Sequence, residues 1–244
     1  MEKLVLQSSV GLWYTLTYML KFTNVTKLYH TGDIALKDIN IHIKPKEFVS
    51  IVGHSGAGKT TLLKLILGEE SPTSGNVHFE DMDIHMLKKS GINMYRRRVG
   101  TVFQDFRLLP DKTAYENVAF AMEAAGRDDE EIAADVPHAL ELVGLRHKAH
   151  SFPDQLSGGE KQRVAIARAI VNQPDMIIAD EPTGNLDPVN TYEIIQLLKK
   201  INDLGTTILL TTHNVGVIDN LGRRVITIKD GKVALDSVEG KYIL

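Results

Sequence analysis

A glycine-rich run between an apolar stretch and a helical pattern constrains the fold of this chain most. The run fits the phosphate-binding pattern G-x-x-x-x-G-K-[ST] and is followed by a second threonine. Residues 48–52 before it predict a buried strand, and residues 60–67 predict a helix. Glycines let backbone N–H groups wrap around phosphates, and a helix N-terminus adds positive potential. The predicted nucleotide-binding residues are Gly53, His54, Ser55, Gly56, Ala57, Gly58, Lys59, Thr60 and Thr61.

Two side chains of this run and two acidic residues further along predict the chemistry of the site. Lys59 is expected to reach the β- and γ-phosphates, and the Thr60 hydroxyl is expected to bind Mg²⁺. An apolar run predicts a strand that delivers Asp180 to the phosphate site as a second magnesium ligand. Glu181 follows at once and can polarise the water that attacks the terminal phosphate. The alternative is that the strand simply ends in two acidic residues exposed to solvent. This alternative is less favoured because a phosphate-binding loop is predicted in the same domain.

Composition narrows the class of protein. The 244 residues are 43% hydrophobic and 24% charged, which is usual for a globular protein of one large or two small domains. The formal net charge of -3 disfavours a general nucleic-acid binder, so no nucleic-acid partner is expected. The sequence contains no cysteine, which excludes disulfides, thiolate catalysis and cysteine metal sites.

The first 18 residues carry no motif. Residues 4–20 are uncharged and fairly apolar, but they include polar side chains and are short for a membrane span. No convincing cleavage site indicates a signal peptide. We expect residues 1–18 to be a disordered extension or a misassigned start, with an interfacial anchor as the alternative, and residues 19–244 to form the folded domain. No other stretch could span a bilayer, so any membrane role is expected to be peripheral.

The order of apolar patterns predicts an α/β fold. Alternating or continuous apolar runs predict strands at residues 20–25, 39–43, 76–79, 175–180 and 206–211. The first two alternate like antiparallel strands, whereas the last two are typical of parallel strands buried on both faces, with a helix at 191–202 between them. The pattern therefore indicates a mostly parallel sheet with flanking helices and an antiparallel β subdomain.

The middle of the chain is helical in pattern. A helical insertion is expected over about residues 105–172, with its clearest periodicity at 113–144. Residues 128–131 are all acidic and suit the positive end of a helix. Pro137 is expected to kink or interrupt that helix. No linker separates this region, so we expect an insertion into one α/β core.

The segment at residues 156–163 identifies the family. It reads LSGGEKQR and precedes a helix predicted over residues 161–171. A hydroxyl and bare N–H groups at a helix start can bind an anion, and a simple helix cap is the alternative. The segment resembles the signature sequence of the ATP-binding-cassette (ABC) ATPases. The resemblance covers residues 20–233 and implies the ABC ATPase fold.

Further motifs follow in the order that this family has. Tyr29 resembles the aromatic residue that stacks on adenine. Gln104 resembles the glutamine that contacts Mg²⁺ and couples to a membrane partner, and Asp187 lies in a segment similar to the loop that crosses the dimer interface. His213 resembles the switch histidine at the γ-phosphate. The resemblance implies catalytic roles for Gln104, Glu181 and His213, and magnesium binding by Thr60, Gln104 and Asp180.

The resemblance also implies how the chain works. Two copies pack head-to-tail with ATP and Mg²⁺ between them, and hydrolysis releases the pair. The phosphate loop of one copy then faces the signature segment of the other. The implied contacts across the dimer come from Ser157, Gly158, Gly159, Glu160 and Asp187. An integral-membrane permease is the implied partner, at the cytoplasmic face of the membrane.

The segment after Gln104 selects a branch of the family. Its string FQDFRLLP is similar to that of members that act in bacterial cell division. Exporter and lipoprotein-release ATPases usually carry other residues in place of Asp105 and Arg107. A transport ATPase is the alternative function. A soluble clamp on DNA or ribosomes is a third, but it would need a long coiled-coil insertion or a second cassette, and this sequence shows neither.

Two positions of this sequence depart from the family pattern. Asn214 follows the switch histidine where aspartate is usual, and Lys161 stands where glutamine is common. Neither change removes a catalytic group. The basic run at residues 96–98 is either a solvated face or a contact with the membrane partner or anionic lipids.

Overall fold

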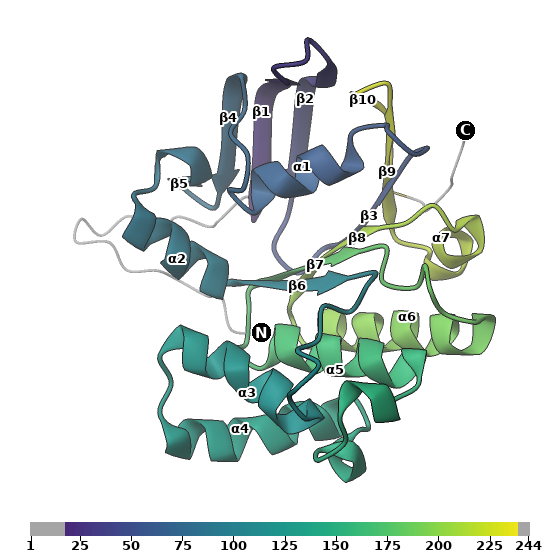
Figure 1. Ribbon diagram of the computed structural model, residues 1–244. Helices are drawn as coiled ribbons and strands as arrows, with labels where there is room; N and C mark the ends of the chain where they lie inside the picture. The colour runs from purple at the N-terminus through teal and green to yellow at the C-terminus, as the bar shows by residue number, and fades with distance from the viewer. Residues whose placement is uncertain (1–17, 239–244) are drawn as a thin grey trace.

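The structure is a computed structural model that describes residues 18–238 (Figure 1). Residues 1–17, on which the expected N-terminal extension falls, lie outside the described residues, as do residues 239–244. The described chain forms one antiparallel sheet and one mostly parallel sheet, with helices between and around them.

The antiparallel sheet has the strand order β2-β1-β4-β5. Its strands are β1 (Leu20–Leu28), β2 (Ile34–Ile43), β4 (Ser74–Phe79) and β5 (Met82–Asp83). Along β1 the apolar residues Leu20, Phe22 and Val25 are buried, which is the alternation that predicted a sheet with one covered face.

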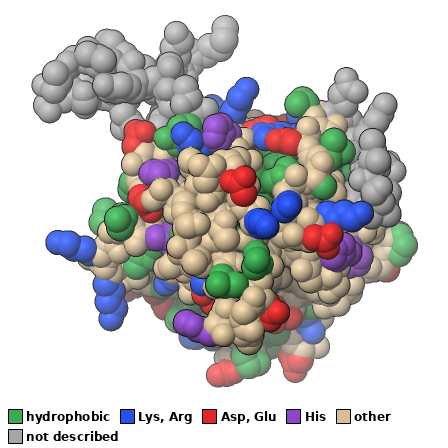
Figure 2. All heavy atoms as spheres, turned by 90° about the horizontal axis from the view of Figure 1, so that it is seen from above, with side chains coloured by type: hydrophobic (Ala, Val, Ile, Leu, Met, Phe, Trp, Pro, Cys, Tyr) green, Lys and Arg blue, Asp and Glu red, His purple; other side chains and the backbone are tan. Residues whose placement is uncertain are grey.

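Acidic, basic and histidine side chains are interspersed over the face of the molecule seen in Figure 2.

The larger sheet has the strand order β10-β9-β3-β8-β7-β6. Its strands are β3 (Phe48–Val52), β6 (Val99–Phe103), β7 (Met176–Asp180), β8 (Thr207–Thr211), β9 (Arg224–Lys229) and β10 (Lys232–Ser237). All neighbours pair in parallel except β9 and β10, which pair antiparallel. The predicted fold class is therefore observed.

The helices lie on both sides of the larger sheet (Figure 1). Helix α1 lies between the two sheets, and α3 to α6 lie on the opposite side. Their bounds are α1 (Lys59–Ile66), α2 (Lys89–Arg97), α3 (Ala114–Ala125), α4 (Asp129–Leu142), α5 (Gly158–Ile170), α6 (Pro188–Asp203) and α7 (Val215–Leu221). Helices α3, α4 and α5 follow β6 and precede β7, so they form the helical insertion.

Alternate residues of the parallel strands belong to two different cores. In β8, Ile208 and Leu210 pack with the helical insertion, whereas Leu209 packs with α1 and the antiparallel sheet. The same alternation places Ile177 of β7 in the first core and Ile178 in the second. A strand buried on both faces reads as a continuous apolar run, and this is why the apolar runs at residues 175–180 and 206–211 predicted these strands.

Of the kink or interruption expected at Pro137, the interruption is wrong, because α4 continues from Asp129 to Leu142 through the proline. A capping box between Asp128 and Glu131 satisfies the start of the helix. Val136 and Leu140, on either side of the proline, are fully buried. Tertiary packing of this apolar face offsets the missing hydrogen bond, since packing stabilises protein helices more than local propensity does.

Candidate functional site

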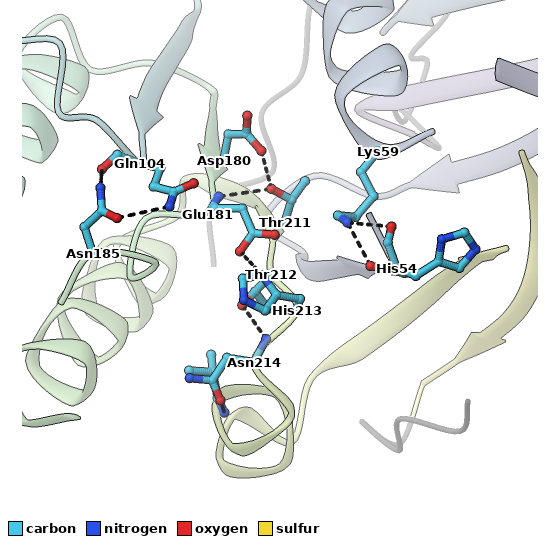
Figure 3. Close-up of polar contacts among 12 residues, drawn as sticks. His54, Lys59, Gln104, Asp180, Glu181, Asn185, Thr211, Thr212, His213 and Asn214 are labelled. Atoms are coloured by element: carbon cyan, nitrogen blue, oxygen red, sulfur yellow. Dashed lines mark hydrogen bonds and ion pairs between the residues drawn. The ribbon is translucent and has the colours of Figure 1, made fainter. Parts of the chain in front are cut away.

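Four predicted segments meet at one edge of the larger sheet because the parallel strands end there together. In the strand register, Phe103 pairs with Asp180, and Asp180 pairs with Thr211. Gln104, Glu181 and the segment that leads to His213 therefore follow neighbouring strand ends (Figure 3). Strand β3 pairs with β8 and delivers the phosphate loop to the same edge. Ligands of parallel α/β sheets bind at this edge.

The phosphate loop begins α1 through a glycine that no other residue could replace without strain. Gly58 caps the helix with φ 109, in the left-handed region. A Cβ atom at this position would lie 2.6 Å from the carbonyl oxygen of Ala35 on β2. The Lys59 ammonium donates hydrogen bonds to the carbonyls of Gly53 (2.8 Å) and His54 (3.2 Å), as Figure 3 shows. The lysine is thus placed over its own loop.

A cavity of about 570 Å³ joins the loop to the strand ends. Its lining contains most of the predicted nucleotide, magnesium and catalytic residues, and Ala35, which the sequence did not indicate. The lining residues are Ala35, Ser55, Gly56, Gly58, Lys59, Thr60, Thr61, Gln104, Asp180, Glu181 and His213. The remaining loop residues Gly53, His54 and Ala57 are not among them.

The predicted adenine-stacking residue lies beside the start of α1. The Tyr29 hydroxyl is 3.3 Å from the Thr61 hydroxyl, and the Lys27 ammonium lies 5.1 Å from the centre of the Tyr29 ring. The ring is partly exposed and does not line the cavity described above. Its place near the loop is compatible with stacking on a base that projects from the phosphates.

The two acidic residues at the end of β7, Asp180 and Glu181, each have a polar partner. His213 Nδ1 lies 2.8 Å from Glu181 Oε2, and the Glu181 side chain is 17% exposed whereas that of His213 is 70% exposed. The Thr211 hydroxyl donates to Asp180 Oδ1 at 2.6 Å (Figure 3). The two acids thus have different partners: Asp180 bonds a hydroxyl, and Glu181 faces an imidazole.

The donor set at this cavity fits Mg²⁺. Thr60, Gln104 and Asp180 supply hydroxyl, amide and carboxylate oxygens around one space, and hard cations such as Mg²⁺ prefer oxygen ligands. Within residues 18–238 no cluster of three or more His, Cys, Asp or Glu side chains forms a metal site. A site with one carboxylate suits Mg²⁺, since this ion is usually held by few carboxylates together with substrate phosphates and water.

Gln104 is held by the loop that follows Glu181. Its Nε2 donates to Asn185 Oδ1 at 3.2 Å, and Asn185 Nδ2 donates to the Gln104 carbonyl at 3.1 Å. A Cβ atom on Gly184 would lie 2.7 Å from Gln104 Nε2. This contact could not be predicted from the sequence, because 81 residues separate the two partners.

The loop after Gln104 adopts an unusual backbone that α5 stabilises. Phe106 and Arg107 have φ angles of 60 and 48, in the left-handed region that costs energy for such side chains. Arg168 of α5 donates to the carbonyls of both, at 2.8 Å and 2.6 Å respectively. Burial lowers the pKa of the Arg168 guanidinium. This arginine is a further residue that sequence analysis missed.

Asn117 of α3 also stabilises the loop after Gln104, and its side chain is fully buried. It accepts from the Leu109 N–H at 2.7 Å and donates to the carbonyls of Leu109, Lys112 and Thr113. We expect Asn117→Ala to lower the free energy of unfolding by about 2 to 3 kcal/mol, because it leaves several buried backbone groups unpaired.

Denaturant unfolding of the purified variant measures this loss. Asn172→Ala is a suitable control, since its amide makes one recorded bond, to the Ala121 carbonyl at 2.9 Å. An Asn117→Ala variant no less stable than that control would contradict the assigned role.

The signature segment lies away from the cavity of its own chain, and none of its residues lines that cavity. Ser157 caps α5: its hydroxyl accepts from the Glu160 N–H at 3.2 Å, and Glu160 accepts from the Ser157 N–H at 2.8 Å. The backbone N–H of Ser157 lowers the pKa of Glu160. Helix α5 therefore starts at Gly158, three residues earlier than predicted.

Asp187 is likewise a helix cap in this chain. Its carboxylate accepts from the N–H groups of Val189 (2.9 Å) and Asn190 (3.0 Å), and the backbone of Asn190 contributes most to lowering its pKa. Asn190 also contacts Gly159, where its side chain fills the space that a Cβ atom would need. The signature segment and the segment of Asp187 thus pack together.

Two residues of the basic run before β6 make contacts within the chain. Arg98 forms ion pairs with Glu80 (2.8 Å) and Asp175 (2.6 Å). Arg96 donates to the carbonyls of Leu67 (3.1 Å) and Gly68 (3.3 Å), just after α1. Arg97 lines a groove of about 630 Å³ between α2, β6, α3 and α5.

Comparison with known proteins begins with sequence. A family model described as "ABC transporter" matches residues 36–184. The chain is 49% identical over 224 residues to the cell division ATP-binding protein FtsE of Bacillus subtilis, covering 92% of this chain and 98% of that protein. It is 46% identical over 213 residues to the protein of the same name from Escherichia coli, covering 87% and 96% respectively.

Solved structures show the same fold. The ATP-binding cassette MJ0796, in a dimeric post-hydrolysis state bound to ADP and Pi, superposes with a TM-score of 0.81 at 39% identity, covering 92% of this chain and 100% of that chain. The cbiO1 protein of Clostridium perfringens, part of the ABC transporter complex cbiONQ, gives a TM-score of 0.85 at 35% identity, covering 92% and 90%.

These similarities confirm the predicted fold, the predicted ATPase family and the resemblance to its cell-division branch. No helix among residues 18–238 is long and apolar enough to cross a membrane. The chain belongs to the ATP-binding-cassette family of ATPases.

Proposed function

We propose that this chain is the ATP-hydrolysing subunit of a cell-division complex at the cytoplasmic face of the membrane, and that its partner is an FtsX-like permease. The observation that carries the enzymatic part is the single cavity that gathers Lys59, Thr60, Asp180, Glu181 and His213. The names of relatives at 46 to 49% identity support the division part. An exporter ATPase is the alternative function.

Each group in the cavity has a role that follows from its chemistry. Lys59 and the N–H groups of the loop neutralise phosphate charge, and Thr60, Gln104 and Asp180 would hold Mg²⁺. When bound, Mg²⁺ would supply positive charge that stabilises the phosphate oxygens. Glu181 orients the attacking water and accepts its proton, while the bond from the γ-phosphorus to the bridging oxygen breaks and ADP leaves. His213, beside Glu181, is suited to contact the transferred phosphate.

The site requires a second copy to be complete. Ser157 and Gly158 are exposed at the N-terminal end of α5, where the helix dipole favours an anion, but they do not face the cavity of their own chain. Asp187 is exposed beside them. A head-to-tail dimer would bring this surface to the phosphates bound by the other copy, so ATP would hold the two copies together.

The groove between α2, β6, α3 and α5 is suited to the permease. Its lining includes Arg96, Arg97 and Arg107 and contains no acidic residue. Phe120 of α3 adds an apolar side chain that is 45% exposed. A segment with acidic and apolar side chains complements such a surface, because opposite potentials favour docking. Arg107 belongs to the loop that follows Gln104, so the groove adjoins the nucleotide site.

The pair Asp105 and Arg107 provides the test of this partner. Their side chains form an exposed ion pair at 3.3 Å, and the Arg107 guanidinium lies 3.8 Å from the centre of the Phe103 ring. Replacing both with alanine should leave ATP binding by the isolated protein nearly unchanged, since neither residue lines the nucleotide cavity. It should reduce recovery of the co-expressed permease severalfold and impair division, because rim charges of this kind set specificity.

A second exposed ion pair in the helical insertion gives a matched control. Glu141 and Arg146 lie 3.1 Å apart and are not part of the groove. Their double alanine variant should recover the permease normally. If the variant of Asp105 and Arg107 does the same and supports normal division, the proposed partner contact is wrong. Loss of solute export without a division defect would instead support the alternative function.

A further inference from the structure

Thr211 lies at the end of β8 and bonds both acidic residues of the site. Its side chain is fully buried, and its hydroxyl donates to Asp180 Oδ1 at 2.6 Å. The same oxygen accepts from the backbone N–H of Glu181 at 3.1 Å (Figure 3). One hydroxyl thus connects the carboxylate of one acid to the backbone of the next.

The second bond matters because the backbone of Glu181 is strained. Glu181 has φ 48, in the left-handed region that a glutamate rarely adopts. Its N–H lies 3.1 Å from the Thr211 carbonyl as well as 3.1 Å from the hydroxyl. Such a conformation persists only where the surroundings enforce it. Thr211 supplies two of the contacts that do so, one from its backbone and one from its side chain.

The first bond fixes the carboxylate of Asp180. A carboxylate with one oxygen bound by a donor presents its other oxygen in one orientation. The preceding β8 residues Ile208, Leu209 and Leu210 are apolar and fully buried, so packing alone does not call for a hydroxyl in this strand. A buried hydroxyl costs free energy unless it is paired, and here it both donates and accepts.

We propose that Thr211 is a positioning residue for the nucleotide site: its hydroxyl orients Asp180 toward the magnesium ion and holds Glu181 in the conformation that serves hydrolysis. The inference rests on the proposed roles of these two acids. Thr211 does not line the cavity and touches no reacting atom, so it acts through its neighbours.

The test compares Thr211→Val and Thr211→Ser in the full chain. Valine keeps the branched shape and removes the hydroxyl, whereas serine keeps the hydroxyl. With valine, the Mg²⁺ concentration needed for half-maximal binding of a fluorescent ATP analogue should rise about tenfold, and kcat should fall about tenfold, as expected for one lost charge-assisted bond. Analogue binding without Mg²⁺ should not change. Serine should restore both values to within about threefold of the original chain.

Thr207→Val is the matched control, because Thr207 lies on the same strand, is equally buried and accepts from the Lys46 N–H at 2.9 Å. Both valine variants should lose some thermal stability, but only Thr211→Val should change the Mg²⁺ dependence. The inference is overturned if Thr211→Val keeps the original Mg²⁺ dependence and kcat, or if serine fails to rescue them.

Asp180→Asn separates this inference from the proposed function. If Asp180→Asn changes the Mg²⁺ dependence and Thr211→Val does not, only the role of Thr211 is wrong. If Asp180→Asn leaves the Mg²⁺ dependence unchanged, the proposed magnesium role of Asp180 fails, and the role of Thr211 fails with it.

Discussion

Glu181→Gln is expected to lower the rate of ATP hydrolysis by about 10² to 10⁴-fold while leaving ATP binding intact. The amide keeps the size of the side chain, which is 17% exposed and close to His213, but it cannot accept a proton from water. ATP should then hold two copies together, because release depends on hydrolysis. Gel filtration with light scattering in Mg-ATP should show a dimer that the original chain forms only transiently.

The control for this variant is Glu141→Gln, which makes the same chemical change at an exposed ion pair of the helical insertion. It should hydrolyse ATP at the original rate and show no stable dimer. A Glu181→Gln variant that hydrolyses ATP as fast as this control would exclude Glu181 as the group that activates water.

Lys59→Ala is expected to weaken ATP binding by about a hundredfold. The change removes an ammonium group that is proposed to donate hydrogen bonds to the negatively charged phosphate oxygens of ATP. The ammonium lies directly over the loop, bonded to the carbonyls of Gly53 and His54. Isothermal titration with ATP and Mg²⁺ measures the loss. Thermal unfolding of the same sample shows whether the loop change has also affected the fold.

Lys64→Ala is the matched control for this second variant. Lys64 lies in the last turn of the same helix, carries the same charge and does not line the cavity. Its loss should leave the dissociation constant for ATP within about twofold, since a partly exposed charge one to two turns away from the phosphate loop is largely screened. Equal affinity of the two variants would refute the assigned role of Lys59.

The sequence predicted the parts of the fold whose signals are local. Buried parallel strands appear as apolar runs, and the motifs follow directly at their ends. The hairpin of β9 and β10 was missed although Asp230 and Gly231, both with positive φ, form a recognisable turn signal. Helices α5 and α6 were predicted to start too late, because their first residues include glycine or proline and were not counted as helical.

Contacts between distant segments could not be predicted in this way. Thr211 bonds Asp180 across 31 residues, and Arg168 bonds Arg107 across 61. A buried threonine in an apolar strand looks like an ordinary strand residue until its neighbour in the sheet is known. The signature segment presents the opposite case: its sequence is distinctive, but the ligand site proposed for it would include a surface of a second chain.

Arg168 connects helix α5 to the loop at Phe106 and Arg107. The helix has 13 residues and is therefore roughly 20 Å long, with Ser157 at its first end and the Arg168 guanidinium near its last turn. Because the arginine is bonded to two backbone carbonyls, the loop at Phe106 and Arg107 must follow when the helix tilts. In the proposed dimer, a displacement of the first end of α5 would therefore reach Arg107, which lines the groove between α2, β6, α3 and α5.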